Sequence, residues 1–140
     1  MRNSKPILLV EDDDVDVMTV RRAFKDLKVT NQLVSTGNGE EALEYLKSRS
    51  NTKPGVILLD LNMPKMNGIE FLKTVKTDEA LKKIPVVVLT TSGAEQDVAE
   101  SFNFGAAGYM VKSVDYMKFV DIIKTIDMYW SLSELPLYGE

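Results

Sequence analysis

The sequence contains no cysteine and no histidine among its 140 residues. The absence of cysteine excludes disulfides, thiolate zinc sites and cysteine nucleophiles. The absence of histidine excludes Ser-His catalysis, imidazole metal sites and a phosphohistidine within this chain. Carboxylates are therefore the acid–base side chains expected to titrate below about pH 8, and a bound metal would have hard oxygen ligands.

Long apolar runs and concentrated basic segments are also missing. No run approaches the roughly 18 apolar residues of a membrane span, and residues 1–5 lead into a strand rather than a signal peptide, so we expect a cytoplasmic protein with no membrane partner. The net charge is −4, with scattered Lys and Arg. Binding of nucleic-acid phosphates needs a concentrated basic face, so we expect no nucleic-acid partner.

Strand and helix patterns alternate along the chain, which is long enough for one globular domain. Continuous apolar runs predict buried strands, and apolar residues spaced by three and four predict helices. The second strand is more polar, which indicates an edge position. Such alternation predicts an α/β fold, a doubly wound five-stranded parallel sheet with five helices. The expected strands are Ile7–Val10, Gln32–Ser35, Val56–Leu59, Val86–Leu89 and Gly108–Val111, with helices over 14–28, from 38, from 67, over 94–104 and from 116.

Capping residues mark several helix ends. Asn38 and Asn67 each precede a glutamate by three residues, the spacing of a capping box. Ser92 precedes Glu95 by the same interval and predicts a third box. Gly105 stands where a left-handed C-terminal cap belongs.

Polar side chains follow four of the expected strands. Glu11 and Asp12 follow the first, Asp60 the third, Thr90 the fourth and Lys112 the fifth. Because the carboxyl ends of parallel strands meet at one edge of the sheet, three carboxylates, a hydroxyl and an ammonium should surround one point. Taken singly, each residue has an ordinary structural role in a turn, a cap or a strand end; their coincidence favours a functional site.

Three neighbouring carboxylates repel one another unless a cation lies between them. Mg²⁺ takes one or two carboxylates together with waters and phosphate oxygens. We therefore predict a Mg²⁺ site made by Asp12, Asp60 and the backbone carbonyl of Asn62, with Glu11 acting through a water. Asp60 is the predicted nucleophile that takes a phosphoryl group as an acyl phosphate, with Lys112 as the neutralising cation.

This pattern resembles the receiver domain of two-component response regulators over about Lys5 to Asp127. The resemblance implies a flavodoxin-like receiver fold with strand order 2-1-3-4-5. It also implies that a partner kinase's phosphohistidine phosphorylates the residue matching Asp60. The motifs that carry it are Leu9–Asp13, Leu58–Pro64, Leu89–Thr90 and Gly108–Lys112.

The resemblance also assigns roles at the site. Glu11 and Asp12, with Asp60 and the Asn62 carbonyl, match the residues that hold Mg²⁺. The phosphate-binding and switch positions match Thr90, Tyr109 and Lys112. For Tyr109, simple core packing and a ring whose rotamer depends on Thr90 remain equal alternatives.

The expected organisation is a receiver domain over 1–128 and an apolar C-terminal extension over 129–140, with no output domain. The extension either packs on its own domain or makes an intermolecular contact. The chain is similar to stand-alone regulators that pair with bacterial phytochromes and other sensor histidine kinases, a subgroup that often forms homodimers. This implies signalling to an unknown downstream protein, and a homodimer face on the fourth helix, fifth strand, last helix and tail.

The chain departs from the family at two positions. Ser113 follows Lys112 where proline is usual, commonly with a cis bond; a cis bond before serine costs roughly 3 kcal/mol, so either the loop is rearranged or neighbours hold the strain. Glu11 stands where aspartate is commoner, so one side chain that would bind the metal is longer by a methylene group.

Two other functions stay open. An aspartyl-phosphate phosphohydrolase or phosphotransferase could use Asp60, but the chain has no cap domain, and Asn62 stands where a second catalytic acid would be. A phosphorylation-independent interaction module would keep the fold without the switch. We expect a signalling protein with at most self-catalysed phosphorylation and dephosphorylation, and not an enzyme.

Overall fold

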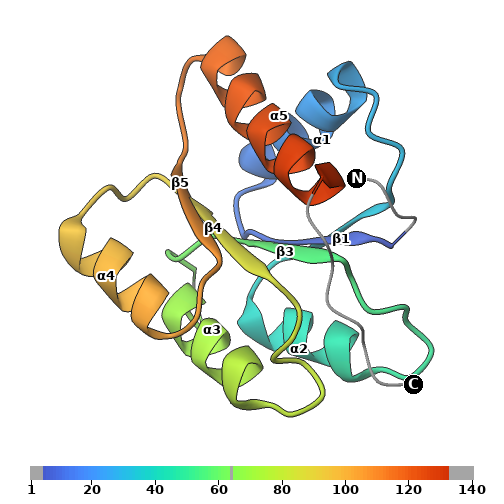
Figure 1. The fold of residues 1–140 in the computed structure, drawn as a ribbon, viewed down its shortest axis with the longest axis vertical. Helices are drawn as coiled ribbons and strands as arrows, with labels where there is room; N and C mark the ends of the chain where they lie inside the picture. The colour runs from blue at the N-terminus through green and yellow to red at the C-terminus, as the bar shows by residue number, and fades with distance from the viewer. Residues whose placement is uncertain (1–4, 64, 133–140) are drawn as a thin grey trace.

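The computed structural model describes residues 5–63 and 65–132. Within these residues five parallel strands form one sheet in the order β2-β1-β3-β4-β5, which confirms the predicted fold. Figure 1 shows α1 and α5 on one face of the sheet and α2, α3 and α4 on the other. The elements are β1 (Ile7–Val10), α1 (Asp14–Asp26), β2 (Leu33–Thr36), α2 (Gly39–Lys47), β3 (Val56–Leu59), α3 (Gly68–Thr77), β4 (Val86–Thr90), α4 (Glu95–Asn103), β5 (Gly108–Val111) and α5 (Tyr116–Leu132).

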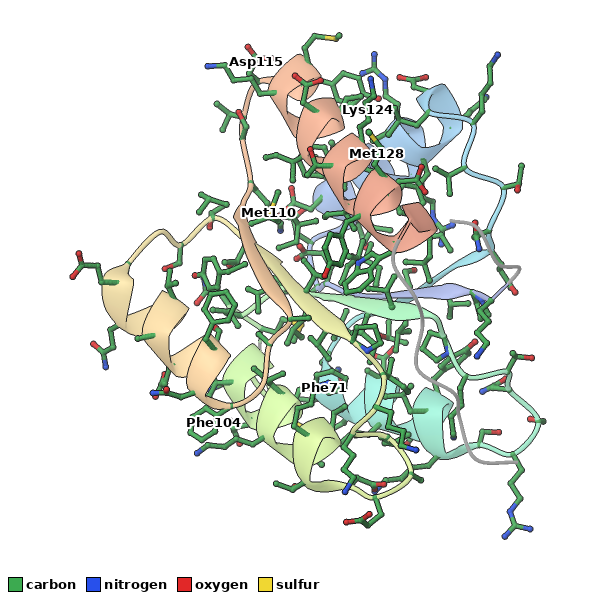
Figure 2. All side chains as sticks on the ribbon, in the orientation of Figure 1. Phe71, Phe104, Met110, Asp115, Lys124 and Met128 are labelled. Carbon is green, nitrogen blue, oxygen red and sulfur yellow. The ribbon has the colours of Figure 1, made fainter. Side chains whose placement is uncertain are left out.

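The central strands are apolar throughout because both faces of the sheet are covered. In β1, Leu8 and Val10 join the core under α2 and α3, whereas Ile7 and Leu9 join the core under α1 and α5. This alternation is the two-residue period of a strand. Figure 2 shows Phe71 of α3 within the layer beside the sheet, where its side chain is fully buried.

The more polar strand β2 lies at an edge of the sheet, as predicted, and begins one residue later than expected. Its backbone pairs only with β1 among the described strands. The opposite edge is β5, whose residues are partly exposed. Both edge strands therefore place fewer side chains in the core than β1 and β3 do.

Helix ends confirm some of the capping predictions and correct one. Asn38 caps α2 and Asn67 caps α3, each accepting a backbone N–H three residues later at 3.0 Å, and Gly105 has a left-handed φ of 97°. The predicted capping box at Ser92 is wrong. Helix α4 starts after Ala94, which offers no side-chain cap, because the Ser92 hydroxyl donates to Asp97 at 2.5 Å instead.

The helix predicted over 14–28 is α1, which ends at Asp26 because Leu27 caps it and Lys28 has a left-handed φ of 58°. The last helix, α5, continues past the expected boundary at 128/129 to Leu132. Trp130 is buried in the core under α5. The rest of the expected extension, 133–140, lies outside the described residues. Among the described helices, none combines the length and apolarity of a membrane span.

Candidate metal and phosphoacceptor site

The carboxylates predicted to gather at one point do so. Strands β1 and β3 pair with Val10 opposite Leu59, and the Asp60 N–H donates to the Val10 carbonyl at 3.0 Å, so the ends of the two strands lie side by side. Carboxylate oxygens of Glu11, Asp12 and Asp60 all lie within 4.8 Å of one another. Such a group of hard oxygen ligands can hold a divalent cation.

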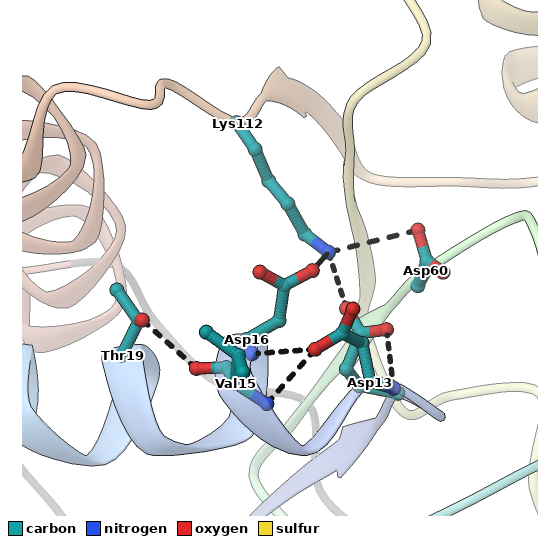
Figure 3. A network of polar contacts seen from close by, with 7 residues as sticks. Asp13, Val15, Asp16, Thr19, Asp60 and Lys112 are labelled. Atoms are coloured by element: carbon teal, nitrogen blue, oxygen red, sulfur yellow. Dashed lines mark hydrogen bonds and ion pairs between the residues drawn. The ribbon is translucent and has the colours of Figure 1, made fainter.

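Lys112 reaches this cluster from the end of β5. The backbone N–H of Lys112 donates to the Thr90 carbonyl at 2.7 Å, which continues the pairing of β4 with β5. The ammonium contacts Glu11 directly, lies 2.9 Å from Asp16 Oδ2 and 3.8 Å from Asp60 Oδ1 (Figure 3). The Lys112 side chain is 8% exposed, and the pocket that these ion pairs line opens to solvent. The Lys112–Ser113 peptide bond is trans.

The site carries more negative charge than Lys112 neutralises. Burial raises the pKa of Glu11 to about 7, against the lowering effects of the Lys112 ammonium, and the Asp60 charge adds to the rise. Burial likewise raises the pKa of Asp60; Lys112 lowers it and Asp12 raises it. Burial lowers the pKa of Lys112, but hydrogen bonds to Glu11 and Asp16 outweigh it, so this pKa is raised. A divalent cation would relieve the repulsion among the carboxylates.

Thr90 ends β4 with a fully buried side chain. Its hydroxyl has no hydrogen-bond partner among the described residues. It lies close enough to Asp60 to lower the pKa of that carboxyl, although the two do not form a hydrogen bond of normal geometry. A buried hydroxyl without a partner is costly, and it is a donor available to a group placed at Asp60.

Tyr109 of β5 pairs with Val88 of β4, and its hydroxyl reaches the loop between β4 and α4. Its hydroxyl donates to the Ser92 carbonyl at 2.7 Å. The ring is half-buried against the core under α2 and α3. Tyr109 thus packs in the core and also fastens the loop that follows Thr90.

Asn62 lies on the rim of the same open pocket. Its side chain is exposed, and the role of its carbonyl stays a prediction. The pocket is lined by Asp16 of α1 and by residues of the loops that follow β1, β3, β4 and β5, namely Glu11, Asp12, Asp13, Asp60, Asn62, Thr91 and Lys112.

Asp16 was not found by sequence reasoning, which followed strand ends alone. The chain turns into α1 directly after the acidic pair, because Asp13 caps the helix by accepting the N–H groups of Val15 and Asp16 at 2.8 and 3.1 Å. The Asp13 N–H in turn donates to Glu11 Oε2 at 3.2 Å. The first turn of α1 therefore lies beside the site, where Asp16 contacts the Lys112 ammonium (Figure 3). The signal in the sequence was the short spacing between the acids and the helix start.

Gly68 is a second residue on which the site depends. A Cβ at this position would lie 2.5 Å from the Asp60 carbonyl oxygen and 2.6 Å from Leu61 Cα. The Gly68 N–H donates to the Leu61 carbonyl at 3.0 Å. The start of α3 thus packs directly on the backbone that carries Asp60, and only glycine permits that approach.

Comparison with known proteins gives the same class as the geometry. The response regulator receiver domain family matches residues 7–124. Response regulator Rcp1 of Synechocystis is 36% identical over 130 residues, which cover 90% of this chain and 88% of Rcp1. The crystal structure of the phosphorylated cyanobacterial phytochrome response regulator RcpA is 37% identical, with a TM-score of 0.90, and covers 96% of this chain and 100% of RcpA.

The Mn²⁺-bound form of Rcp1 is a third close match. It is 36% identical, with a TM-score of 0.86, and the match covers 95% of this chain and 99% of Rcp1. The fold and the acidic cluster define an α/β domain with a candidate divalent-metal site at the carboxyl ends of its strands. This chain belongs to the response regulator receiver domain family.

Proposed function

We propose that this chain is a single-domain response regulator that accepts a phosphoryl group on Asp60 from a sensor histidine kinase, in a Mg²⁺-dependent reaction, and signals through altered protein contacts. The receiver would occupy residues 1–128, followed by the apolar extension. The observation that carries the proposal is the cluster of Glu11, Asp12 and Asp60, with carboxylate oxygens within 4.8 Å of one another and Lys112 against them.

The proposed transfer uses the Asp60 carboxylate as nucleophile. One Asp60 oxygen forms a bond to phosphorus while the phosphorus–nitrogen bond of the donor's phosphohistidine breaks, and the electron pair leaves with the imidazole, which then takes a proton. Lys112, with its ammonium 3.8 Å from Asp60 Oδ1, would offset charge on the transferred oxygens. The donor must be another molecule because this chain has no histidine.

The acidic cluster fits a divalent cation, since oxygens of three carboxylates lie within 4.8 Å of one another. Glu11, Asp12, Asp60 and the Asn62 carbonyl would hold Mg²⁺, and when bound it would neutralise part of the phosphoryl charge. Support also comes from Rcp1, a relative solved in a Mn²⁺-bound form.

The proposed switch begins at the buried Thr90 hydroxyl, which has no partner among the described residues. A phosphoryl group adds nearly two negative charges and strong acceptor oxygens, so this hydroxyl would donate to it. The loop after Thr90 is fastened by the hydrogen bond from Tyr109 to the Ser92 carbonyl. Movement of Thr90 would therefore act on Tyr109 and on the face formed by α4, β5 and α5.

The proposed partners follow from relatives and from exposed apolar residues. RcpA is a phytochrome response regulator, which supports a phytochrome-type histidine kinase as donor. Val111, Met117, Met128 and Tyr129 on β5 and α5 are each at least 45% exposed, and Figure 2 marks Met128 on α5. Exposed large apolar side chains can serve contact sites, so this face would serve a homodimer or a downstream protein.

A phosphohydrolase is the rival function, and turnover of a phosphomonoester would distinguish it from a response regulator. The position two residues after Asp60 is Asn62, which cannot act as a second acid, and the acidic pocket is open to solvent. A generic phosphomonoester should therefore give no steady turnover. Steady release of phosphate that depends on Asp60 would establish the hydrolase instead.

Intact-mass measurement after treatment with acetyl phosphate and Mg²⁺ tests the proposal. We expect one added phosphoryl group on the wild-type chain and none on Asp60→Ala. Omitting Mg²⁺ should abolish the adduct, and sizing of both forms would report the homodimer. An adduct that persists in Asp60→Ala, or no adduct on the wild type, would refute Asp60 as the acceptor.

A further inference from the structure

The Lys112 ammonium lies on the α1 side of the acidic site. It contacts Glu11 and lies 2.9 Å from Asp16 Oδ2, whereas Asp60 Oδ1 is 3.8 Å away. Figure 3 shows the lysine side chain descending between Asp16 and Asp60. Glu11 and Asp16, at or near the start of α1, thus hold the Lys112 ammonium, which a phosphoryl group on Asp60 would need.

Asp16 differs from Glu11 in its relation to a metal. Glu11 belongs to the group of carboxylates that could bind a cation, and Asp16 does not. A cation bound there would neutralise Glu11, Asp12 and Asp60 but would leave the charge of Asp16 facing Lys112. Asp16 would then be the carboxylate that still competes with a phosphoryl group on Asp60 for the Lys112 ammonium.

We propose that Asp16 is a positioning residue that holds the Lys112 ammonium toward α1 and thereby weakens the binding of a phosphoryl group at Asp60. The inference rests on the proposed function, because it deepens the account of the same site. A phosphoryl group brings nearly two negative charges to Asp60, and the ammonium must leave the 2.9 Å contact with Asp16 to approach it. Asp16 sets how readily that movement occurs.

The first turn of α1 supplies a matched control. Asp14 and Asp16 both lie in this turn, and both favour the positive end of the helix dipole. Asp14 is exposed, and the ion pairs found for Lys112 are with Glu11, Asp16 and Asp60. Replacing either aspartate by asparagine removes the same charge from the same helix turn, so a difference between the variants reports the contact with Lys112.

The experiment measures the affinity for beryllofluoride, a mimic of a phosphoryl group on a carboxylate, in saturating Mg²⁺. We expect Asp16→Asn to bind it about fivefold more tightly than the wild type, the size of one partly exposed ion pair. Asp14→Asn should bind beryllofluoride as the wild type does. Asp16→Glu, which keeps the negative charge, should also retain wild-type affinity. In a Lys112→Met background, Asp16→Asn should have no effect, since a double-mutant cycle isolates the pair.

A second readout does not depend on the mimic or on Lys112→Met folding. The Lys112 Cε resonance in NMR should shift in Asp16→Asn and stay unchanged in Asp14→Asn. Weaker or unchanged beryllofluoride binding by Asp16→Asn, or equal effects of the two variants, would overturn the inference while the wild-type adduct at Asp60 still stood. Failure of the wild type to form any adduct would refute the proposed function and this inference with it.

Discussion

Ionisation of Glu11 should destabilise the metal-free domain as the pH rises. Burial raises the pKa of Glu11 from 4.5 to about 7. Between these values the folded state binds more protons than the unfolded state, so the free energy of unfolding falls as the pH increases. The groups that face Glu11 are the Lys112 ammonium from β5, the Asp60 carboxylate from β3, Asp12 beside it and the Asp13 N–H.

The neighbouring groups do not reverse this sign. The pKa of Asp60 is also raised by burial, so its ionisation acts in the same direction. The pKa of Lys112 is raised above 10.5, so the lysine stays protonated throughout this range. The chain has no histidine and no cysteine, so other side chains contribute little between about pH 5 and about pH 8.

The magnitude follows from the two pKa values of Glu11. The difference between 4.5 and about 7 corresponds to roughly 3 kcal/mol. The Glu11 side chain is 3% exposed, but its pocket opens to solvent, which screens the charges. We therefore expect the metal-free domain to lose about 1–2 kcal/mol of stability across this range.

Urea unfolding in EDTA, followed by circular dichroism at several pH values, measures the effect. Glu11→Gln should remove most of the pH dependence, whereas Glu44→Gln, an exposed change on α2, should leave it intact. Saturating Mg²⁺ should also flatten the curve, because a ligand bound to the folded state stabilises its ionised carboxylates. Stability that rises with pH in EDTA, or a fall that Glu11→Gln retains, would refute the assigned electrostatics.

Three further outcomes test the packing around the site. Gly68→Ala should cost about 1–3 kcal/mol in urea unfolding, because its Cβ would lie 2.5 Å from the Asp60 carbonyl oxygen; wild-type stability would contradict this. Thr90→Val should stabilise the unmodified domain by about 1 kcal/mol, since it removes a buried hydroxyl without a partner, and should shorten the lifetime of the Asp60 adduct; an unchanged lifetime would exclude Thr90 from phosphate binding. Trp130→Ala should cost about 3 kcal/mol, because Trp130 lies in the core under α5; a neutral effect would show that the core ends before residue 129.

Local patterns in the sequence predicted the sheet because its three central strands are buried on both faces. The apolar runs 7–10 and 56–59 stop at the point where the chain leaves the sheet, and their first polar residues meet there. Asn38 and Asn67 acted as predicted, because a helix cap depends on residues three positions apart.

The particular partner of a polar side chain could not be predicted in the same way. Ser92 has the spacing of a cap, but its hydroxyl donates to Asp97 in the first turn of α4. Lys112 was expected at Asp60, and its ammonium lies closer to Asp16 of α1, which stands 96 residues earlier in the chain. The choice among several carboxylates depends on side-chain positions in three dimensions, which strand ends alone do not specify.

In the metal-free domain the acidic site lowers the free energy of unfolding, whereas the apolar core raises it. Burial of Glu11 and Asp60 raises the pKa of both, so their ionised forms destabilise the fold. The fully buried residues of β1 and β3 on either side of the sheet offset this cost. Because the carboxylates repel one another and Lys112 is shared among three of them, added positive charge is favoured there and the lysine has alternative positions. Under the proposed function, one cation or one phosphoryl group would change the charge balance of this site, which is the physical requirement for a switch.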